Sequence, residues 1–291
     1  MTERKRKQKT EVSVIGSGRL GTTLAVALER RGYSIQSLVA RNVQSARKAA
    51  RLLGNEEQLE VQVLAGKELR SLKPADVFLI TVPDDQIAGV AAELSRLEFT
   101  ATVFHTSGAL SSDVLNPLRQ KGWHTGSIHP LLSVSNAGDA IDGAFWSVEG
   151  DKSATRLGKA IVQSLGGKSF FIRSEDKPLY HAAAVMVSGN VVALFDVALE
   201  MLAACDIKRE TAQHILLPLI TSTVRNLETK DPARALTGTF ARGDLETVKR
   251  HLAALKDSNL TDALELYRAL GKRSLKLTKE HPQITQILKS V

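Results

Sequence analysis

The sequence is poor in cysteine and in aromatic residues, and it lacks a long uninterrupted apolar run. Among its 291 residues the only cysteine is Cys205, which excludes a disulfide framework and a zinc site built from several cysteines. No apolar run reaches the roughly 20 residues that a membrane-spanning helix needs. No hydrophobic segment follows the basic start of the chain, so we expect neither a membrane location nor a secretory signal, and we predict a cytoplasmic protein.

Positive charge is concentrated at the start of the chain. The net charge is +8, and residues 1–10 contain five lysines and arginines. We predict that residues 1–10 form a basic, disordered tail, because chain termini are usually frayed. Binding of nucleic acid by residues 4–9 is the alternative, but aromatic residues are only 4% of the chain and none alternates with a basic stripe. The remaining positive charge suits an anionic cofactor or substrate.

Short apolar runs alternate with helical patterns from residue 11 to residue 173. Hydrophobic residues make up 43% and charged residues 24% of the chain, which are globular proportions. The expected strands are 11–15, 33–39, 61–64, 76–82, 102–105, 124–128, 144–148 and 169–172. The expected helices between them are 19–31, 43–53, 87–97, 112–121 and 153–165. This alternation predicts an α/β Rossmann-like domain, a doubly wound and mostly parallel sheet covered on both faces.

The pattern changes after Arg173, where only helical periodicity is found. The expected helices are 177–204, 210–228 with a bend at Pro218, 244–255, 261–279 and 284–289. We therefore predict two domains, residues 11–173 for cofactor binding and an all-α C-terminal domain, residues 174–291, for substrate binding and dimerisation. Ser174 is the expected N-cap at the boundary.

A glycine-rich turn joins the first strand to the first helix. Gly16 permits the tight turn, Gly18 lets the backbone approach a pyrophosphate, and Gly21 lets the helix pack closely on the strand. The start of the helix offers N–H groups and a partial positive charge to phosphates. The predicted cofactor-binding residues of the turn are Gly16, Ser17, Gly18, Arg19, Leu20 and Gly21. A glycine turn without a ligand remains the alternative.

Arg41 follows the second strand, where an NAD site usually has an acidic residue that binds the ribose. A guanidinium can hold a 2′-phosphate through two hydrogen bonds, whereas a carboxylate would repel it. Arg41 therefore favours NADP over NAD. The alternative is a solvated arginine at the start of a helix.

Three further strands end in loops that should face the cofactor. Val82 and Pro83 follow one strand and Ser107 follows another, and we predict that all three bind the cofactor. His105 is a candidate for substrate binding and His129 for acid–base catalysis, although a buried imidazole satisfied by the backbone is as plausible for each.

The helix that starts at Lys177 carries further candidates. At 100° per residue, Lys177, His181 and Ser188 share one face, and Asn190 points away from it. Lys177 and His181 are predicted catalytic residues and Ser188 a substrate-binding residue. The alternative is a packing face with a solvated lysine. A zinc site of His105, His129 and His181 is conceivable but has no typical ligand spacing, so no metal is predicted.

A later turn, Thr237-Gly238-Thr239-Phe240-Ala241-Arg242-Gly243-Asp244, combines glycines with a charged pair. Asp244 is the expected N-cap of the next helix. Arg242 could bind a substrate carboxylate, or it could form a local salt bridge with Asp244.

Together these segments resemble a family of oxidoreductase-like proteins that pair a Rossmann-like domain with a C-terminal helical domain of unknown function. The resemblance covers residues 11–282. It is carried by Ile15-Gly16-Ser17-Gly18-Arg19-Leu20-Gly21, His105-Thr106-Ser107-Gly108, Ser127-Ile128-His129-Pro130, Tyr180-His181-Ala182-Ala183, Leu236-Thr237-Gly238 and Ala241-Arg242-Gly243-Asp244.

More distantly, the chain is similar to 6-phosphogluconate, β-hydroxyacid and prephenate dehydrogenases and to pyrroline-5-carboxylate reductase. Lys177 matches the lysine of β-hydroxyacid dehydrogenases, and His181 stands where they have asparagine. His129-Pro130 is similar to the His-Pro loop of prephenate dehydrogenase, which implies an acid–base role for His129. The resemblance also implies NADP and a homodimer formed through the helices.

The leading hypothesis is an NADP-dependent oxidoreductase that transfers a hydride to or from a small polar, carboxylate-bearing substrate. The nicotinamide would lie over the strand ends, between the two domains. Lys177, His181 or His129 would transfer the proton, and Ser107 and Ser188 would orient the substrate. The alternative is a non-catalytic NADP-binding sensor or partner protein, which needs the glycine turn and Arg41 only.

Overall fold

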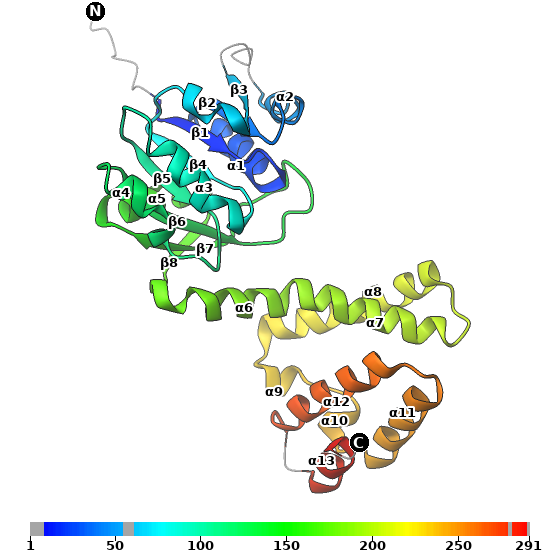
Figure 1. Cartoon of the computed structure of the whole chain (residues 1–291). Coiled ribbons are helices and arrows are strands. Elements are labelled where there is room, and N and C mark those ends of the chain that lie inside the picture. Colours follow the sequence, from blue (N-terminus) through cyan, green and yellow to red (C-terminus); the bar gives the residue numbers. More distant parts are fainter. Residues whose placement is uncertain (1–8, 55–60, 279–280, 290–291) are drawn as a thin grey trace, which may run out of the picture. The chain divides into compact units, whose positions relative to one another are not determined.

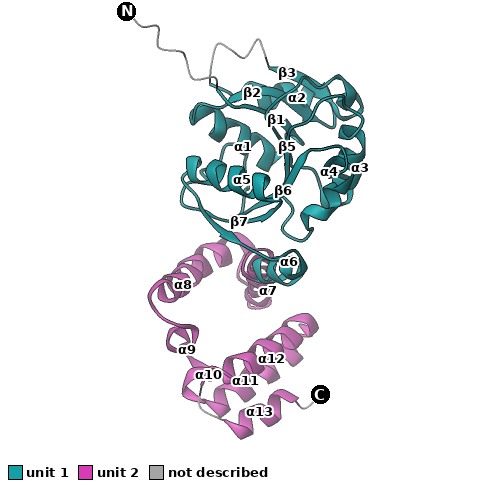
Figure 2. Ribbon diagram, turned by 90° about the vertical axis from the view of Figure 1, so that its left-hand side faces the viewer, with its two compact units in different colours: residues 1–186 teal, residues 187–291 magenta. Residues whose placement is uncertain are grey.

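The computed structural model describes residues 9–54, 61–278 and 281–289. The chain divides by internal packing into two compact units, Met1–Met186 and Val187–Val291 (Figure 2). Residues 1–8 of the predicted basic tail, residues 1–10, lie outside the described residues. The division into compact units falls after Met186, within the helix that begins at Lys177, and the expected domain boundary at 173/174 stays a prediction.

The first unit is built on one eight-stranded sheet with the order β3-β2-β1-β4-β5-β6-β7-β8 (Figure 1). All neighbouring strands are parallel except β6 and β7, which are antiparallel. The strands are β1 Glu11–Ile15, β2 Ser34–Ala40, β3 Gln62–Ala65, β4 Val77–Ile80, β5 Thr102–His105, β6 His124–Leu131, β7 Phe145–Gly150 and β8 Lys168–Phe171. The predicted doubly wound, mostly parallel sheet is confirmed.

The central strands are apolar on both faces because helices cover both faces. Val77 and Leu79 of β4 belong to a cluster that includes side chains of α1 and α5. Phe78 and Ile80 of the same strand belong to a second cluster with α3 and α4. Figure 2 shows these two helical layers on opposite sides of the sheet. The α-helices are α1 Arg19–Arg30, α2 Val43–Ala50, α3 Asp84–Leu94, α4 Asn116–Arg119 and α5 Lys152–Ser164, with 3₁₀ helices at Gly66–Ser71, Ser112–Leu115 and Ser174–Asp176.

The chain direction across the sheet creates one crevice. Strand β1 pairs with β2 on one side and with β4 on the other, so the connections leave β1 and β4 in opposite directions. In open α/β sheets, ligands bind at this point, beyond the carboxyl ends of the strands. The glycine turn after β1 and the loop after β4 both lie there.

The long helix expected over residues 177–204 is interrupted. Helix α6 spans Lys177–Val187 and α7 spans Gly189–Ala203, with Ser188 between them at φ −118° and ψ −87°. These angles are not helical, so the face predicted to join Lys177 to Ser188 ends before Ser188. Ser174 does not cap the helix as expected; it begins a 3₁₀ turn, and its hydroxyl lies 3.3 Å from Glu149 Oε2.

The described part of the second unit is all-α, as predicted. Helix α8 continues through Pro218, and α11 begins after Asp244, whose carboxylate accepts the N–H of Thr247 at 3.0 Å, the expected N-cap. A small core of Val248, Ile284 and Leu288 holds the last helices together. The helices after α7 are α8 Arg209–Thr229, α9 Pro232–Ala235, α10 Thr239–Arg242, α11 Leu245–Asp257, α12 Thr261–Leu275 and α13 Pro282–Lys289.

One stretch is more apolar than the sequence analysis assumed. Within Ser174–Ala203 an 18-residue window has a mean hydropathy of 1.9, and the stretch could cross a membrane by length and composition alone. Scattered polar residues, among them Lys177 and Asp196, interrupt every apolar run in this stretch, and for that reason a search for uninterrupted runs does not find it. A single helix of this length and composition is weak evidence for a membrane span, so the expected cytoplasmic location stays a prediction.

Candidate functional site

The glycine turn after β1 is packed so closely that two of its positions exclude a side chain. A Cβ on Gly16, which has φ +107°, would lie 2.7 Å from the Thr81 carbonyl carbon. A Cβ on Gly21 would lie 2.3 Å from the Gly16 carbonyl oxygen and 2.4 Å from Thr81 Oγ1. Thr81 Oγ1 also donates a hydrogen bond to the Gly16 carbonyl oxygen at 2.7 Å. The turn is therefore fixed by backbone contacts between β1, α1 and the end of β4.

The same turn is open on its outer side. A Cβ on Gly18 would meet only the Gly16 carbonyl oxygen, at 3.9 Å. Gly18 is the N-cap of α1, so the first turn of the helix and its partial positive charge lie directly behind this open backbone. The geometry suits an anionic group that approaches the main chain, as the sequence predicted.

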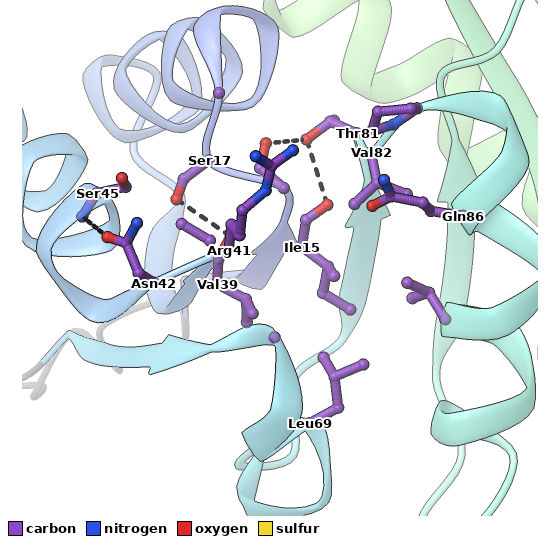
Figure 3. A pocket seen from close by; sticks show the side chains of 16 residues that line it. Ile15, Ser17, Val39, Arg41, Asn42, Ser45, Leu69, Thr81, Val82 and Gln86 are labelled. Carbon is purple, nitrogen blue, oxygen red and sulfur yellow. Dashed lines mark hydrogen bonds between the residues drawn. The ribbon is translucent and has the colours of Figure 1, made fainter.

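A cavity of about 660 Å³ extends from this turn to the end of β2 (Figure 3). Figure 3 shows the Arg41 side chain among the central lining residues, with Asn42 and Ser45 to one side. Asn42 Oδ1 accepts the Ser45 N–H at 2.9 Å and so caps α2, which directs the start of a second helix into the cavity. None of the 16 described residues that line the cavity is acidic. This volume and lining fit a ligand with several negative charges.

A second cavity of about 530 Å³ shares Thr81, Val82 and Pro83 with the first. Ser107 fixes one of its walls: the hydroxyl donates to Asp84 Oδ2 at 2.8 Å and accepts the N–H groups of Ala109 and Leu110. The structure thus places several predicted residues together around this cavity. They are Arg19, Leu20, Val82, Pro83, Ser107, His129 and His181.

Two imidazole rings meet at Gly108 in this second cavity. The rings of His129 and His181 are 5.7 Å apart and nearly perpendicular. A Cβ on Gly108 would lie 2.5 Å from His181 Cδ2 and 2.8 Å from His129 Nε2. Burial, with smaller contributions from Lys177 and His181, lowers the pKa of His129 to about 4, so this ring is neutral at pH 7. His129 Nδ1 lies 2.7 Å from the Tyr180 hydroxyl.

Lys177 is buried behind the two cavities and does not reach the space where a substrate would bind. Its side chain is 0% exposed and is not among those that line either cavity. Its Nζ donates to the Ser107 carbonyl oxygen at 3.1 Å and to the Ser127 hydroxyl at 2.9 Å, and lies 3.9 Å from Glu149 Oε1. Burial lowers the pKa of Lys177, and the Glu149 carboxylate opposes that shift. This geometry argues against the predicted proton donation to substrate, because protein groups surround the amine.

His105 is likewise enclosed. It is 0% exposed, and its Nδ1 accepts the Ser107 N–H at 3.2 Å. Burial, assisted by the charge of Lys177, lowers the pKa of His105 to about 3. The prediction that His105 binds substrate is therefore corrected: its imidazole is buried, with Nδ1 bonded to the backbone and Nε2 without a hydrogen-bond partner among the described residues. Within the described residues, the three histidines of the conceivable zinc site do not form a group that could hold a metal ion.

Two predicted residues are not part of this arrangement. Ser188 and Arg242 belong to the second unit, and their predicted roles in substrate binding stay predictions. Arg242 ends α10, and its charge is a minor contribution to the lowered pKa of Asp244, which the Thr247 N–H chiefly causes.

The sequence analysis missed several residues that the structure brings to the two cavities. Asn42 and Ser45 could have been found from their N-cap spacing directly after Arg41. Thr81 carries no local signal, because its role is set by contact with Gly16 and Gly21. Tyr180 adjoins His181 in the sequence, but its contact with His129 depends on how α6 lies on the sheet.

Comparisons with known proteins agree with this architecture. Residues 2–130 match a Rossmann-like domain. Residues 144–274 match a domain of unknown function, DUF2520. The chain joins a Rossmann-like domain to a DUF2520 domain. The DUF2520 domain begins within the sheet, at β7, and includes α6, so Tyr180 and His181 belong to it while the glycine turn and His129 belong to the Rossmann-like domain.

Solved structures share this two-domain fold. A Thermotoga maritima protein is 26% identical with a TM-score of 0.71, and the match covers 92% of this chain and 98% of that one. A Bacteroides fragilis protein provisionally assigned as an NADP oxidoreductase is 24% identical with a TM-score of 0.74 and the same coverage. A pyrroline carboxylate reductase from Plasmodium falciparum, with NADP bound, is 13% identical with a TM-score of 0.57 and coverage of 92% and 98%. No curated protein matches the chain in sequence.

Proposed function

We propose that the protein is an NADP-dependent oxidoreductase that acts on a small polar substrate beside the carboxyl ends of β1, β4 and β5. The observation that carries the proposal is the junction of two cavities. A glycine-lined cavity without acidic residues adjoins a second cavity that contains two imidazole rings. The names of the solved relatives, an NADP oxidoreductase and a pyrroline carboxylate reductase, support the same class of reaction.

The residues of the first cavity fit NADP. The pyrophosphate would lie against Gly16 and Gly18, where the outer side of the turn has room for a ligand. The 2′-phosphate would lie at Arg41 and the start of α2, where Asn42 and Ser45 supply further polar groups. The same arrangement explains a preference over NAD, since no carboxylate among the described lining residues would hold an unphosphorylated ribose.

When bound, NADP(H) accepts or supplies a hydride. The protein must then hold the substrate and provide for one proton. His129 and His181 line the second cavity and are the side chains that can donate a hydrogen bond or move a proton there. Lys177 has a different task in this proposal: through the Ser107 carbonyl oxygen and Ser127 it holds the loop that carries Ser107 and Gly108.

A carboxylate-bearing substrate remains the proposed class. Arg19 lines the second cavity and is exposed, and it can pair with a carboxylate. Asp84 also lines this cavity, but it accepts the hydrogen bond of Ser107, which occupies part of its acceptor capacity. The carbon that reacts would be that of a carbonyl, an imine or an alcohol.

The test is consumption of NADPH with a panel of keto acids, their esters and cyclic imines. Turnover with a keto acid but not with its methyl ester would support both the reaction and the carboxylate. No oxidation of NADPH with any member, by protein that binds NADPH, would favour the alternative, a non-catalytic sensor. His181→Gln serves as the matched variant, because it removes a proposed catalytic ring and leaves the first cavity intact.

We also propose that the protein is a homodimer through its helical unit. Large apolar side chains of this unit are exposed, among them Val187 at 77%, Val192 at 71% and Leu219 at 63%. Helices α7 and α8, which carry Val192 and Leu219, pack against each other, and exposed apolar side chains gathered on neighbouring helices are typical of interfaces. Sedimentation should give a dimer for the wild type and a monomer for Leu219→Lys. Leu52→Lys, at an exposed leucine of the first unit, should remain dimeric.

A further inference from the structure

His129 has two ring nitrogens in different surroundings. Nδ1 faces Tyr180, whose hydroxyl is 2.7 Å away, and the two rings are perpendicular with centroids 5.6 Å apart. Nε2 lies on the opposite side of the ring, toward Gly108 and the second cavity. In a neutral imidazole one nitrogen carries the proton and the other accepts, so the partner of Nδ1 decides what Nε2 can do.

The surroundings of Tyr180 favour donation from its hydroxyl to Nδ1. The side chain is held between His129 and Phe170 of β8, whose rings meet it edge-on. Burial raises the pKa of Tyr180, so the hydroxyl keeps its proton. The Tyr180 ring is fixed in this position, and its hydroxyl proton needs an acceptor that a neutral Nδ1 supplies.

We propose that Tyr180 is a positioning residue whose hydroxyl donates to Nδ1 of His129 and thereby holds this imidazole as the tautomer with its proton on Nε2. His129 then presents an N–H group, not a bare nitrogen, to the second cavity beside Gly108. Resting on the proposed function, this adds the substrate class: a compound with a hydrogen-bond acceptor at the reacting carbon, a carbonyl or a neutral imine. His129 would polarise that acceptor as a neutral donor.

The charged groups around the ring are consistent with a neutral His129. Lys177 and His181 both lower the pKa of His129. Arg19 lines the same cavity and adds positive charge. Asp84 is the acidic group on this cavity among the described residues, and its Oδ2 accepts the hydrogen bond of Ser107.

The experiment is ¹⁵N NMR of histidine-labelled protein at pH 7, with His129 assigned by the loss of its signals in His129→Gln. In the wild type, Nε2 should show the shift of a protonated ring nitrogen and Nδ1 that of an unprotonated one. In Tyr180→Phe, the two nitrogens should move toward averaged shifts, because Nδ1 has lost its hydrogen-bond donor. Tyr33→Phe is the matched control, because its hydroxyl lies 3.1 Å from Ser164 in the same unit, and it should leave His129 unchanged.

A wild-type His129 with its proton on Nδ1 would overturn the proposal, whether or not Tyr180→Phe folds. An unchanged His129 spectrum in folded Tyr180→Phe would overturn it as well. These results do not depend on NADP or on any substrate. If the tautomer is as proposed and no NADPH is consumed with any tested compound, only the proposed function fails.

Discussion

The two cavities of the first unit are built in different ways. The first is built around the glycine turn after β1, whose close contacts exclude side chains, and residues that follow β2, β3 and β4 complete its lining. The second is shaped by side chains from the loop after β5, from β6 and from α6, which are brought together only by the sheet and its covering helix. A backbone site is specified by where side chains must be absent. A site formed by side chains is specified by the buried residues that contact and hold each of those side chains.

The sharpest way to break the first cavity is to add one carbon. Gly21→Ala would place a Cβ 2.3 Å from the Gly16 carbonyl oxygen and 2.4 Å from Thr81 Oγ1. The turn must shift, and we expect NADPH affinity, measured by fluorescence titration, to fall about 100-fold or more, or roughly 2.7 kcal/mol. Gly89→Ala in α3 is the control, because a Cβ there meets nothing within 4 Å. Normal NADPH binding by Gly21→Ala would show that the turn does not cradle the cofactor.

The second cavity should be disrupted by loss of Lys177, which holds the loop of Ser107 and Gly108. Lys177→Met removes a buried amine and leaves Glu149 without its cation. We expect the free energy of unfolding in urea to fall by about 3 kcal/mol, because breaking a buried ion pair leaves a charge uncompensated. Lys159→Met, at an exposed lysine of α5, should change it little. Full stability of Lys177→Met together with lost turnover would instead place Lys177 in contact with substrate.

Substitution of Arg41 should affect the binding of NADPH but not the binding of NADH. Arg41→Ala should weaken binding of NADPH about 10-fold, roughly 1.4 kcal/mol, and leave binding of NADH unchanged, because only NADPH has the 2′-phosphate. Calorimetric titration with both cofactors measures this. Arg47→Ala, an exposed arginine in the same helix α2, should change neither value. Equal losses for both cofactors would show that Arg41 acts on something other than the 2′-phosphate.

A further expected effect is a pH dependence of stability from the imidazoles His105 and His129. The pKa values of His105 and His129 are lowered to about 3 and about 4, so below pH 6.5 the unfolded chain binds protons that the folded chain does not. The free energy of unfolding should therefore fall as the pH is lowered from 7 to 5. Urea unfolding at both pH values should show a smaller fall in His129→Gln. An unchanged slope would mean that His129 is protonated in the folded protein.

The sequence indicated the glycine turn and Arg41 of the first cavity, because their signals are local, but it did not indicate Asn42, Ser45 or Thr81. The strand of residues 11–15, the glycines at 16, 18 and 21, and Arg41 after the second strand each follow a rule about neighbouring residues. Rules about neighbouring residues gave a wrong prediction where tertiary contacts determine the structure. The 100° periodicity placed Ser188 on the face of Lys177, but the helix is interrupted at Ser188.

Burial explains the other corrections. Lys177 and His105 carry groups that could do chemistry, and nothing in their own segments tells whether those groups meet solvent or Glu149 and Ser107. Tyr180 was overlooked for the opposite reason, since its partner His129 is 51 positions away in the sequence. The contacts that form the second cavity are set by how α6 packs against β6, and no local pattern encodes that packing.

Calorimetric titration of the wild-type protein with NADPH and with NADH tests the central claim most directly. The account predicts uptake of NADPH with at least about tenfold tighter affinity than NADH, since phosphate contacts at Arg41 are added to those of the glycine turn. Folded protein that takes up neither cofactor would contradict it.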